Sequence, residues 1–345
     1  MLFSVTYLGD DTFRGKKLQA KKSWWPDLML NPTPTTLYYK NLTSKMKPKV
    51  TIGVCVRNSE DSIKAAISSI ADQNFPHGLL EIVFVDDGSD DNTLSAIRES
   101  VLGMDISVTV YHTAWNGIGH ARNVVLSHGV GAYILWVDGD MALCPDYIRK
   151  LVDLMDANPE LGIAKGKQTL KPMGNVLGVL EGLSRAASRM VDYKSNYNPS
   201  KALGTGGSIY RTEMISAVGK FDETLRGYGE DWDFELRARA AGWLLCTLDV
   251  EFFDYERQGI TWSSLWRRYW LRGYHLHHFL HKHEGLIKHT RMIPPVSFLA
   301  GLIQSRTLFK LTRKKIVFLL PFEYWFKTSA WYAGFLNGYS ASKKS

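Results

Sequence analysis

Two pairs of acidic residues stand where apolar runs end, and their spacing suits metal and nucleotide chemistry. Asp86 and Asp87 follow one apolar run, and Asp138 and Asp140 follow another. Carboxylates this close repel unless a cation joins them, and hard oxygen ligands suit Mg²⁺ or Mn²⁺, which bridge phosphate oxygens. Asp138 and Asp140 therefore predict a divalent-metal site. Asp86 and Asp87 can accept hydrogen bonds from a base or a ribose, although capping of the following helix is the alternative.

A third acidic group follows two glycines and precedes a predicted helix over residues 234–241. Its members are Glu230, Asp231 and Asp233. One interpretation is helix capping, because the helix macrodipole favours carboxylates at its start. The other is a general base that takes a proton from an attacking hydroxyl, in a segment whose glycines let the chain follow the edge of an active site.

Two glycine-containing segments could present their backbone to a ligand. Residues 204–208 include Gly206 and Gly207, which permit close backbone approach, with a flexible loop as the alternative. Residues 116–123 form a glycine turn that enters a helix and carries Arg122, an arrangement that suits an anion. This second segment has neither the G-x-G-x-x-G spacing of dinucleotide-binding proteins nor a Walker A loop.

Strands and helices alternate around these motifs. The expected strands are 49–56, 80–85, 107–111 and 133–137, and the expected helices are 59–73, 91–102, 119–127 and 145–157. Such alternation predicts an α/β fold, with a mostly parallel sheet covered by helices on both faces. Ligands of such sheets bind at the carboxyl ends of the strands, which is where the acidic pairs stand.

The composition fits a folded intracellular protein. The chain has 345 residues, of which 45% are hydrophobic and 22% charged, and this excludes a mainly disordered chain. Its three cysteines exclude a disulfide scaffold and fit a reduced compartment. We see neither a secretory signal nor an uncharged apolar run of the about 18 residues that a membrane span needs. We therefore expect a cytoplasmic protein.

The charge is unevenly distributed, and the C-terminal region combines basic with aromatic residues. Residues 1–48 carry a net charge of +5, residues 49–256 one of −10, and residues 257–345 one of +13. The stretch from Trp262 to Phe279 has aromatic and basic residues at helical spacing, which predicts a helix lying on an anionic membrane surface rather than a nucleic-acid site. A solvated basic tail is the alternative. His277 and His281 have zinc-pair spacing but lack the H-E-x-x-H pattern.

Taken in order, the motifs resemble those of the family 2 glycosyltransferases with the GT-A fold. The resemblance covers roughly residues 48–248 and is carried by five motifs together, each modest alone. They are Val54-Cys55-Val56-Arg57-Asn58, Val85-Asp86-Asp87-Gly88-Ser89, Asn116-x-Gly-x-x-x-Ala121-Arg122-Asn123, Asp138-x-Asp140 and Gly229-Glu230-Asp231-x-Asp233.

The resemblance implies an inverting enzyme that moves one sugar from a UDP- or GDP-sugar to an acceptor hydroxyl, on a lipid-linked or surface glycan. The implied donor contacts are Asp86 and Asp87 on base and ribose, Val56, Asn58 and Arg122 along the nucleotide, and Asp138 on the ribose or the metal. Asp140 is implied as the ligand of Mn²⁺ or Mg²⁺. The implied catalytic base is Asp231, supported by Glu230 and Asp233, with Gly206, Gly207 and Asp233 on the acceptor side.

The sequence departs from that family in one place and leaves other functions open. Many relatives have a histidine after the last core strand, whereas residues 252–257 here have none, and Asp254 is the candidate substitute. The Q-x-x-R-W motif of processive synthases is absent, which favours transfer of a single sugar. The alternatives are transfer to a polyprenyl phosphate, which needs no base, a nucleotidyltransferase, and a non-catalytic membrane adaptor with a degenerate core.

These observations predict three regions and a location. We expect an N-terminal extension over 1–48, a GT-A catalytic domain over 49–256, and a helical, amphipathic membrane-associating region over 257–345. The expected partners are a nucleotide-sugar donor, a glycan or lipid-linked acceptor and an anionic membrane surface, with no nucleic acid. The protein is expected at the cytoplasmic face, peripheral on the inner side of the membrane.

Overall fold

The protein is described from a computed structural model. The structure describes residues 35–37, 46–170, 175–189, 202–225, 227–254, 260–283 and 293–342. Most of the predicted N-terminal extension lies outside these residues. Within it the structure describes the short strand β1 (Thr35–Leu37) and residues 46–48.

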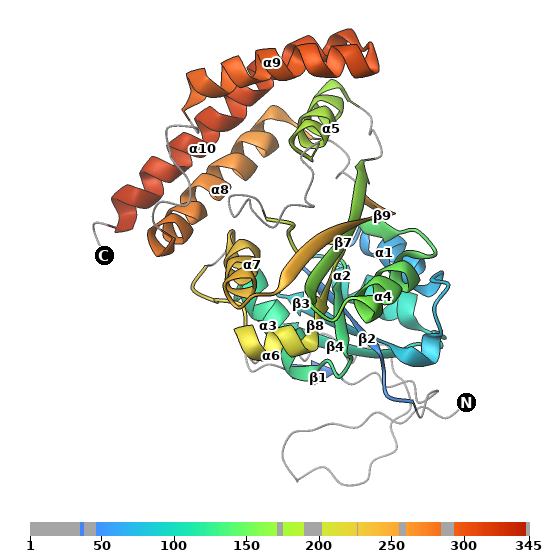
Figure 1. Ribbon diagram of the computed structural model, residues 1–345. Helices are drawn as coiled ribbons and strands as arrows, with labels where there is room; N and C mark the ends of the chain where they lie inside the picture. Colours follow the sequence, from blue (N-terminus) through green and yellow to red (C-terminus); the bar gives the residue numbers. More distant parts are fainter. Residues whose placement is uncertain are drawn as a thin grey trace.

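One sheet organises the part of the chain between residues 50 and 254 (Figure 1). Its strand order is β1-β4-β3-β2-β5-β8-β7-β9-β6. Strands β4, β3, β2 and β5 run parallel to their neighbours in that group, β7 is parallel to β9, and the remaining pairs are antiparallel. The other strands are β2 (Val50–Val56), β3 (Leu80–Asp87), β4 (Ser107–Thr113), β5 (Tyr133–Trp136), β6 (Met141–Leu143), β7 (Leu161–Leu170), β8 (Ser208–Arg211) and β9 (Leu244–Asp254).

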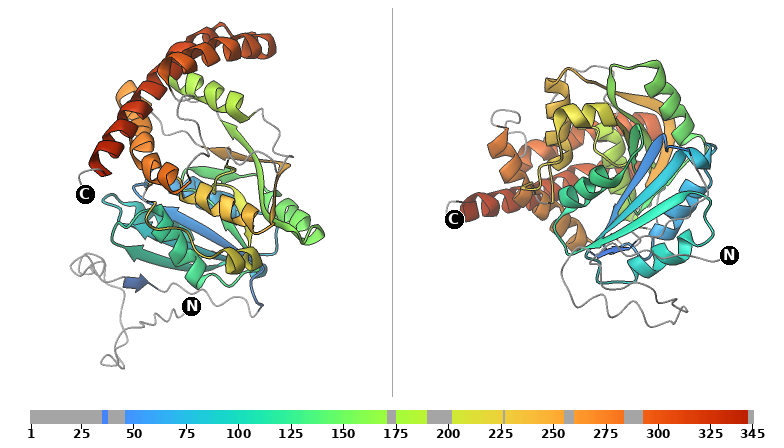
Figure 2. Two further views of the ribbon diagram at one scale, coloured as in Figure 1. Left: turned by 60° about the vertical axis from the view of Figure 1, so that its left-hand side comes forward. Right: turned by 90° about the horizontal axis from the view of Figure 1, so that it is seen from below.

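Helices cover both faces of this sheet, which confirms the expected α/β fold class (Figure 2). Successive side chains of a strand point to opposite faces. In β3, Ile82 and Phe84 therefore pack with one set of helices, whereas Val83 and Val85 pack with the other. The first set is α1 (Ile63–Ala71), α2 (Thr93–Val101) and α4 (Tyr147–Ala157), and the second is α3 (Ile118–His128), α6 (Thr212–Val218) and α7 (Glu230–Ala240).

Helix α7 begins earlier than expected. The sequence pattern placed its start at Phe234, whereas the structure starts it at Glu230, one turn before. Gly229 has a φ of 100°, a left-handed conformation that glycine adopts readily and that turns the chain into the helix. The acidic residues Glu230, Asp231 and Asp233 therefore form the first turn of α7 itself, where the macrodipole favours them.

Helix α5 (Val176–Arg189) and the C-terminal helices pack together in a second group, here called the helical unit. It comprises α5, α8 (Trp262–Lys282), α9 (Pro294–Thr312), the 3₁₀ helix η4 (Lys315–Leu319) and α10 (Leu320–Ser342). Figure 1 shows these helices together at one end of the molecule, beyond the ends of β7 and β9. The described residues include no helix that is both long and apolar enough to span a bilayer.

Small residues allow the long helices of this unit to pack closely. Gly273 of α8 lies against the backbone of Trp331 in α10, and Gly334 of α10 lies against the backbone of Trp270 in α8. A Cβ atom on Gly301 of α9 would lie 2.6 Å from Pro321 Cα in α10. Helix α9 therefore approaches α10 so closely that a side chain at residue 301 would not fit. The predicted surface helix α8 thus buries one face against α10.

Candidate active site

One large cavity lies between the sheet and the helical unit. This main cavity has a volume of about 730 Å³ and is lined on the sheet side by Arg122, Asp138, Gly206, Asp231 and Asp254. These residues come from α3, the segment after β5, the loop before β8, the start of α7 and the end of β9. Folding therefore brings together side chains from five separate parts of the chain.

Asp138 is one of three aspartates on the sheet side of the main cavity, with Asp231 and Asp254. Burial raises its pKa; Arg122 and Lys165 act against this, whereas the carboxylates of Asp254 and Asp231 raise it further. The Cα of Gly206 lies so close to Asp138 Oδ2 that a Cβ atom would overlap it. The backbone thus fixes the position of a carboxylate that has two acidic neighbours.

The donors around Asp138 fit a hard divalent cation. Asp138 and Asp254 both line the main cavity, and Asp254 accepts a hydrogen bond from Gln168. Asp140 does not line it, and the described residues contain no cluster of three or more His, Cys, Asp or Glu suited to an ion. Mg²⁺ commonly uses one or two carboxylates together with substrate phosphates, and the two cavity aspartates match that requirement.

Arg122 and Glu230 form a buried ion pair beside the cavity. Arg122 Nη1 lies 2.5 Å from Glu230 Oε1, and its Nη2 donates to Thr205 Oγ1. Burial, helped by the adjacent Asp231 charge, raises the pKa of Glu230 to about 7, although Arg122 opposes the shift. Glu230 therefore holds Arg122, while its neighbour Asp231 faces the cavity.

Asp231 occupies the first turn of α7 and lines the main cavity. Its Oδ1 accepts a hydrogen bond of 2.8 Å from the Trp232 N–H. The facing loop is held by Glu235, which accepts hydrogen bonds from the N–H groups of Leu203 (2.8 Å) and Gly204 (2.7 Å). Helix α7 thus supplies an acid to the cavity and fixes the neighbouring loop, whose Gly204 also lines it.

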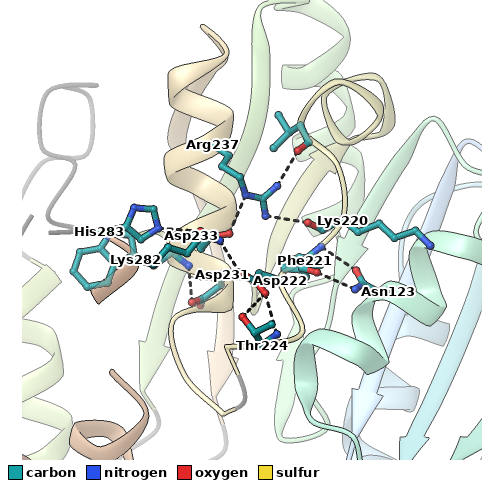
Figure 3. A network of polar contacts seen from close by, with 12 residues as sticks. Asn123, Lys220, Phe221, Asp222, Thr224, Asp231, Asp233, Arg237, Lys282 and His283 are labelled. Carbon is teal, nitrogen blue, oxygen red and sulfur yellow. Dashed lines mark hydrogen bonds and ion pairs between the residues drawn. The ribbon is translucent and has the colours of Figure 1, made fainter. Parts of the chain in front are cut away.

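Asp233 does not line the main cavity, and it lies in a network of polar contacts with basic side chains (Figure 3). It is fully buried and contacts Arg237 Nε (2.9 Å), Lys282 Nζ (2.8 Å) and His283 Nε2 (2.9 Å). Burial acts to raise the pKa of Asp233, but hydrogen bonds from these partners lower it overall. Lys282 also bonds Asp222 at 2.6 Å. The network therefore joins α7 to the end of α8. Gly207, another residue expected on the acceptor side, does not line the main cavity either.

The acidic pair at the end of β3 is buried and internally bonded. Asp86 Oδ2 lies 2.7 Å from His112 Nδ1, and this hydrogen bond raises the pKa of His112. Asp87 accepts hydrogen bonds from the N–H groups of Asn116 (2.9 Å) and Gly117 (3.0 Å). Both carboxylates thus organise the loops after β3 and β4, and neither lines the main cavity.

Beside this pair the structure places an aromatic surface that the sequence pattern did not identify. Trp115 is 59% exposed, and the guanidinium of Arg57 lies 5.0 Å from its ring centroid. Of the expected nucleotide contacts nearby, Val56 is buried, and Asn58 Oδ1 accepts from the Asp90 N–H at 2.9 Å. The signal that the sequence offered for this surface was a tryptophan, Trp115, in a polar loop.

The helical unit supplies the opposite wall of the main cavity, which the sequence pattern also missed. Its lining residues are Ser184, Tyr269, Arg272, Gln304, Tyr324 and Lys327. They come from all four α-helices of the unit. The C-terminal region therefore completes the candidate site as well as packing beside it.

Two family models match this chain. The model described as glycosyl transferase family 2 matches residues 51–175, and the model described as glycosyl transferase family group 2 matches residues 133–340. Together they span the sheet, the candidate site and most of the helical unit.

Two relatives whose names describe them as glycosyltransferases agree with these matches. The poly(ribitol-phosphate) beta-N-acetylglucosaminyltransferase TarS of Staphylococcus aureus is 36% identical over 102 residues, which are 30% of this chain and 17% of TarS. The uncharacterized glycosyltransferase EpsJ of Bacillus subtilis is 32% identical over 217 residues, 61% of this chain and 62% of EpsJ. This chain thus spans less than two thirds of the length of either relative.

A solved structure shares the fold. The mannosyltransferase PcManGT of Pyrobaculum calidifontis, determined with GDP-Man and Mn²⁺, has a TM-score of 0.58 and 18% identity. The similarity covers 85% of this chain and 88% of that one. The likeness supports the GT-A type of fold expected from the sequence.

Proposed function

The chain belongs to glycosyl transferase family 2, and we propose that it transfers one sugar from a UDP- or GDP-sugar to an acceptor hydroxyl with inversion. The observation that carries this proposal is the main cavity, where Asp138 and Asp231 face the same space. Asp138 suits the metal that binds the donor, and Asp231 suits removal of the proton from the acceptor hydroxyl. The transfer needs both functions within reach of one sugar.

The donor side is assigned to the strand ends. We assign Asp138, together with Asp254, to Mn²⁺ or Mg²⁺, and we place Asp140, which lies two residues after Asp138, beside them. Such a cation supplies Lewis-acid stabilisation of the negative charge on the leaving diphosphate. The nucleotide lies along Val56, Asn58, Asp86, Asp87 and Arg122, and the exposed ring of Trp115 gives its base a surface for stacking.

The acceptor side is assigned to Asp231. As general base it takes the proton from the attacking hydroxyl, and one displacement with one base inverts the anomeric centre. Glu230 keeps Arg122 in place, and Asp233 fixes the helix that carries Asp231. A polyprenyl phosphate acceptor is already anionic and needs no base, so Asp231 favours a hydroxyl on a lipid-linked or surface glycan.

We assign residues 49–256 to catalysis and propose that residues 257–345 also dock the protein on the cytoplasmic face of an anionic membrane. The support is the outer surface of α9, η4 and α10, where large apolar side chains are exposed. They include Leu299 (60%), Ile303 (69%), Phe318 (48%), Phe322 (59%) and Trp325 (51%). Lys310, Arg313, Lys314 and Lys315 lie in the same segment. Such a mixture suits anionic lipid better than nucleic acid.

The test is sugar-nucleotide hydrolysis by purified protein. A panel of UDP- and GDP-sugars is measured with Mn²⁺ and with EDTA, for wild type, Asp138→Asn and Asp231→Asn. We expect metal-dependent hydrolysis of one donor, reduced about a hundredfold or more in both variants. Asp231→Asn should still be stabilised by donor and metal, because its change lies on the acceptor side.

Asp249→Asn is the matched control, because this exposed aspartate pairs with Lys167 away from the cavity. It should hydrolyse the donor at the wild-type rate. The proposal is wrong if no sugar nucleotide with Mn²⁺ raises the melting temperature of the wild type. It is also wrong if Asp231→Asn retains full activity.

A further inference from the structure

Two of the residues on the helical side of the main cavity are cationic, Lys327 and Arg272, and they differ in their hydrogen-bond and ion-pair partners. Lys327 is buried and donates to Glu181 (2.8 Å), Ser184 (2.7 Å) and Glu323 (2.7 Å). An ammonium group has three donors, so these contacts use all of them. Lys327 therefore holds α5 against α10 and has no donor left for a ligand.

Arg272 lies beside Lys327 in a different environment. Its guanidinium lies 5.1 Å from the ring centroid of Tyr269 and 5.7 Å from that of Tyr228. Within the described part of the chain, no carboxylate forms an ion pair with it. Aromatic rings orient the planar guanidinium and leave its N–H edge for an external acceptor.

A smaller side cavity shows on which side of the site Arg272 lies. This side cavity has a volume of about 240 Å³ and shares Tyr269, Arg272, Tyr324 and Lys327 with the main cavity. Its other walls include Tyr228, Trp232 and Trp331, and none of the carboxylates at the strand ends lines it. Arg272 therefore lies where the main cavity continues away from Asp138, which is the side left for an acceptor.

The two glutamates nearest to Lys327 do not pair with Arg272 in the described part of the chain. Glu181 and Glu323 share Lys327, and burial raises the pKa of Glu323 to about 8. Both carboxylates are therefore engaged with Lys327, and neither forms an ion pair with Arg272. Arg272 is half-buried and has no ion-pair partner among the described residues, so its guanidinium can bind an anion that enters the cavity.

We propose that Arg272 binds a negatively charged group of the acceptor, so that the substrate receiving the sugar is acidic, bearing a phosphate or a carboxylate. The side cavity, with its aromatic walls, holds the part of the acceptor that carries this group. The inference rests on the proposed transferase function. It adds the chemical class of the acceptor and the residue that selects it.

The experiment measures anion binding with the donor side occupied. Wild-type protein is saturated with Mn²⁺ and either UDP or GDP, then titrated with glucose, glucose 6-phosphate and glucuronate while tryptophan fluorescence is followed. Trp232 and Trp331 line the side cavity and report on its occupation. We expect at least one anionic probe to bind about tenfold more tightly than glucose, the usual size of one charge-assisted contact.

Three variants assign the preference to its residue. Arg272→Gln should remove the preference for the anion, and Arg272→Lys should keep part of it. Arg267→Gln removes the same charge from an exposed position of α8 outside both cavities and should behave as wild type. Melting temperatures of all three variants show that they are folded.

Three results would overturn the inference. In the first, the wild type binds all probes alike or binds none of them. In the second, Arg272→Gln retains the preference for the anionic probe. A third is that Arg272→Gln weakens UDP or GDP binding and leaves the probes unaffected, which would assign Arg272 to the donor diphosphate. None of these readings requires turnover, so they remain separate from a failure of the transferase proposal, which shows as absence of donor binding and hydrolysis.

Discussion

Gly206 shows how closely the backbone approaches the acidic centre of the main cavity. Its φ lies outside the positive range, so alanine is compatible with its backbone, but a Cβ atom would overlap Asp138 Oδ2. Gly206→Ala must therefore displace the carboxylate that we assign to the metal. We expect metal-dependent hydrolysis to fall about tenfold or more, with a loss of stability of roughly 1–3 kcal/mol from overpacking.

Kinetics and thermal unfolding of Gly206→Ala check this expectation. The matched control is Gly119→Ala, because a Cβ at Gly119 would meet its nearest neighbour at an ordinary 3.5 Å. A Gly206→Ala protein with unchanged metal-dependent activity would show that Asp138 does not need its observed position.

At the residue scale, the sequence could predict the side chains that follow strand ends but not those brought in by tertiary packing. Asp138, Asp231, Arg122 and Gly206 were singled out by spacing, and all four line the main cavity. Arg272 was not, because nothing in the local pattern of α8 encodes its place on the wall of the main cavity. The direction of a side chain was equally out of reach, as with Asp233, which shares a helix turn with Asp231 but pairs with Arg237 and does not line the cavity.

At the scale of elements, periodicity predicted the parallel part of the sheet and its helices because each pattern is local. The antiparallel additions are set by long-range contacts, as where β8 pairs with β5 and β7. The start of α7 was misplaced because acidic residues after a glycine fit both a loop and a first helical turn. The packing of α8 on α10 through Gly273 and Gly334 was not anticipated either.

The acidic pair between α5 and α10 predicts a pH-dependent stability of the helical unit. The pKa of Glu323 is about 8 in the folded protein, mainly because of burial, against 4.5 for an ordinary glutamate. Between these values the folded state keeps a proton that the unfolded state has released. Its stabilising effect is complete below pH 4.5 and is lost as the pH rises through about 8.

Glu323→Gln cannot release this proton, so its melting temperature should fall less than that of wild type between about pH 5 and pH 8. Glu230 and Glu235, each with a pKa of about 7, keep part of the dependence in both proteins. Thermal unfolding across this range is the measurement, with Glu160→Gln as the exposed control. Parallel curves for wild type and Glu323→Gln would contradict the expectation.

At the scale of the whole molecule, the same helices serve two surfaces. On the side that faces the main cavity, α9 contributes Gln304 and α10 contributes Tyr324 and Lys327. On its outer side, α9 exposes Leu299 and Ile303. Docking of the outer side on a bilayer would bring the acceptor side of the cavity close to the lipid headgroups, where an acidic membrane-linked acceptor would be found.

The membrane proposal predicts binding that depends on both apolar and basic residues. Wild-type protein should sediment with vesicles containing anionic lipid and much less with zwitterionic vesicles. Replacing Lys314 and Lys315 by alanine should weaken binding, because each basic residue near an anionic surface contributes about 1 kcal/mol, roughly fivefold. Leu299→Asp with Ile303→Asp should weaken binding further, since two exposed apolar side chains are lost from the contact.

Leu102→Asp gives the matched control, because this leucine is 59% exposed at the end of α2, far along the chain from the helical unit. It introduces one aspartate at an exposed apolar position outside the proposed contact, so its vesicle binding should equal that of wild type. Donor hydrolysis in detergent-free buffer should remain in the Leu299→Asp, Ile303→Asp protein, since neither residue lines the main cavity. If that protein binds vesicles as wild type does, or if Leu102→Asp loses binding equally, then the outer face of α9 is not the membrane contact.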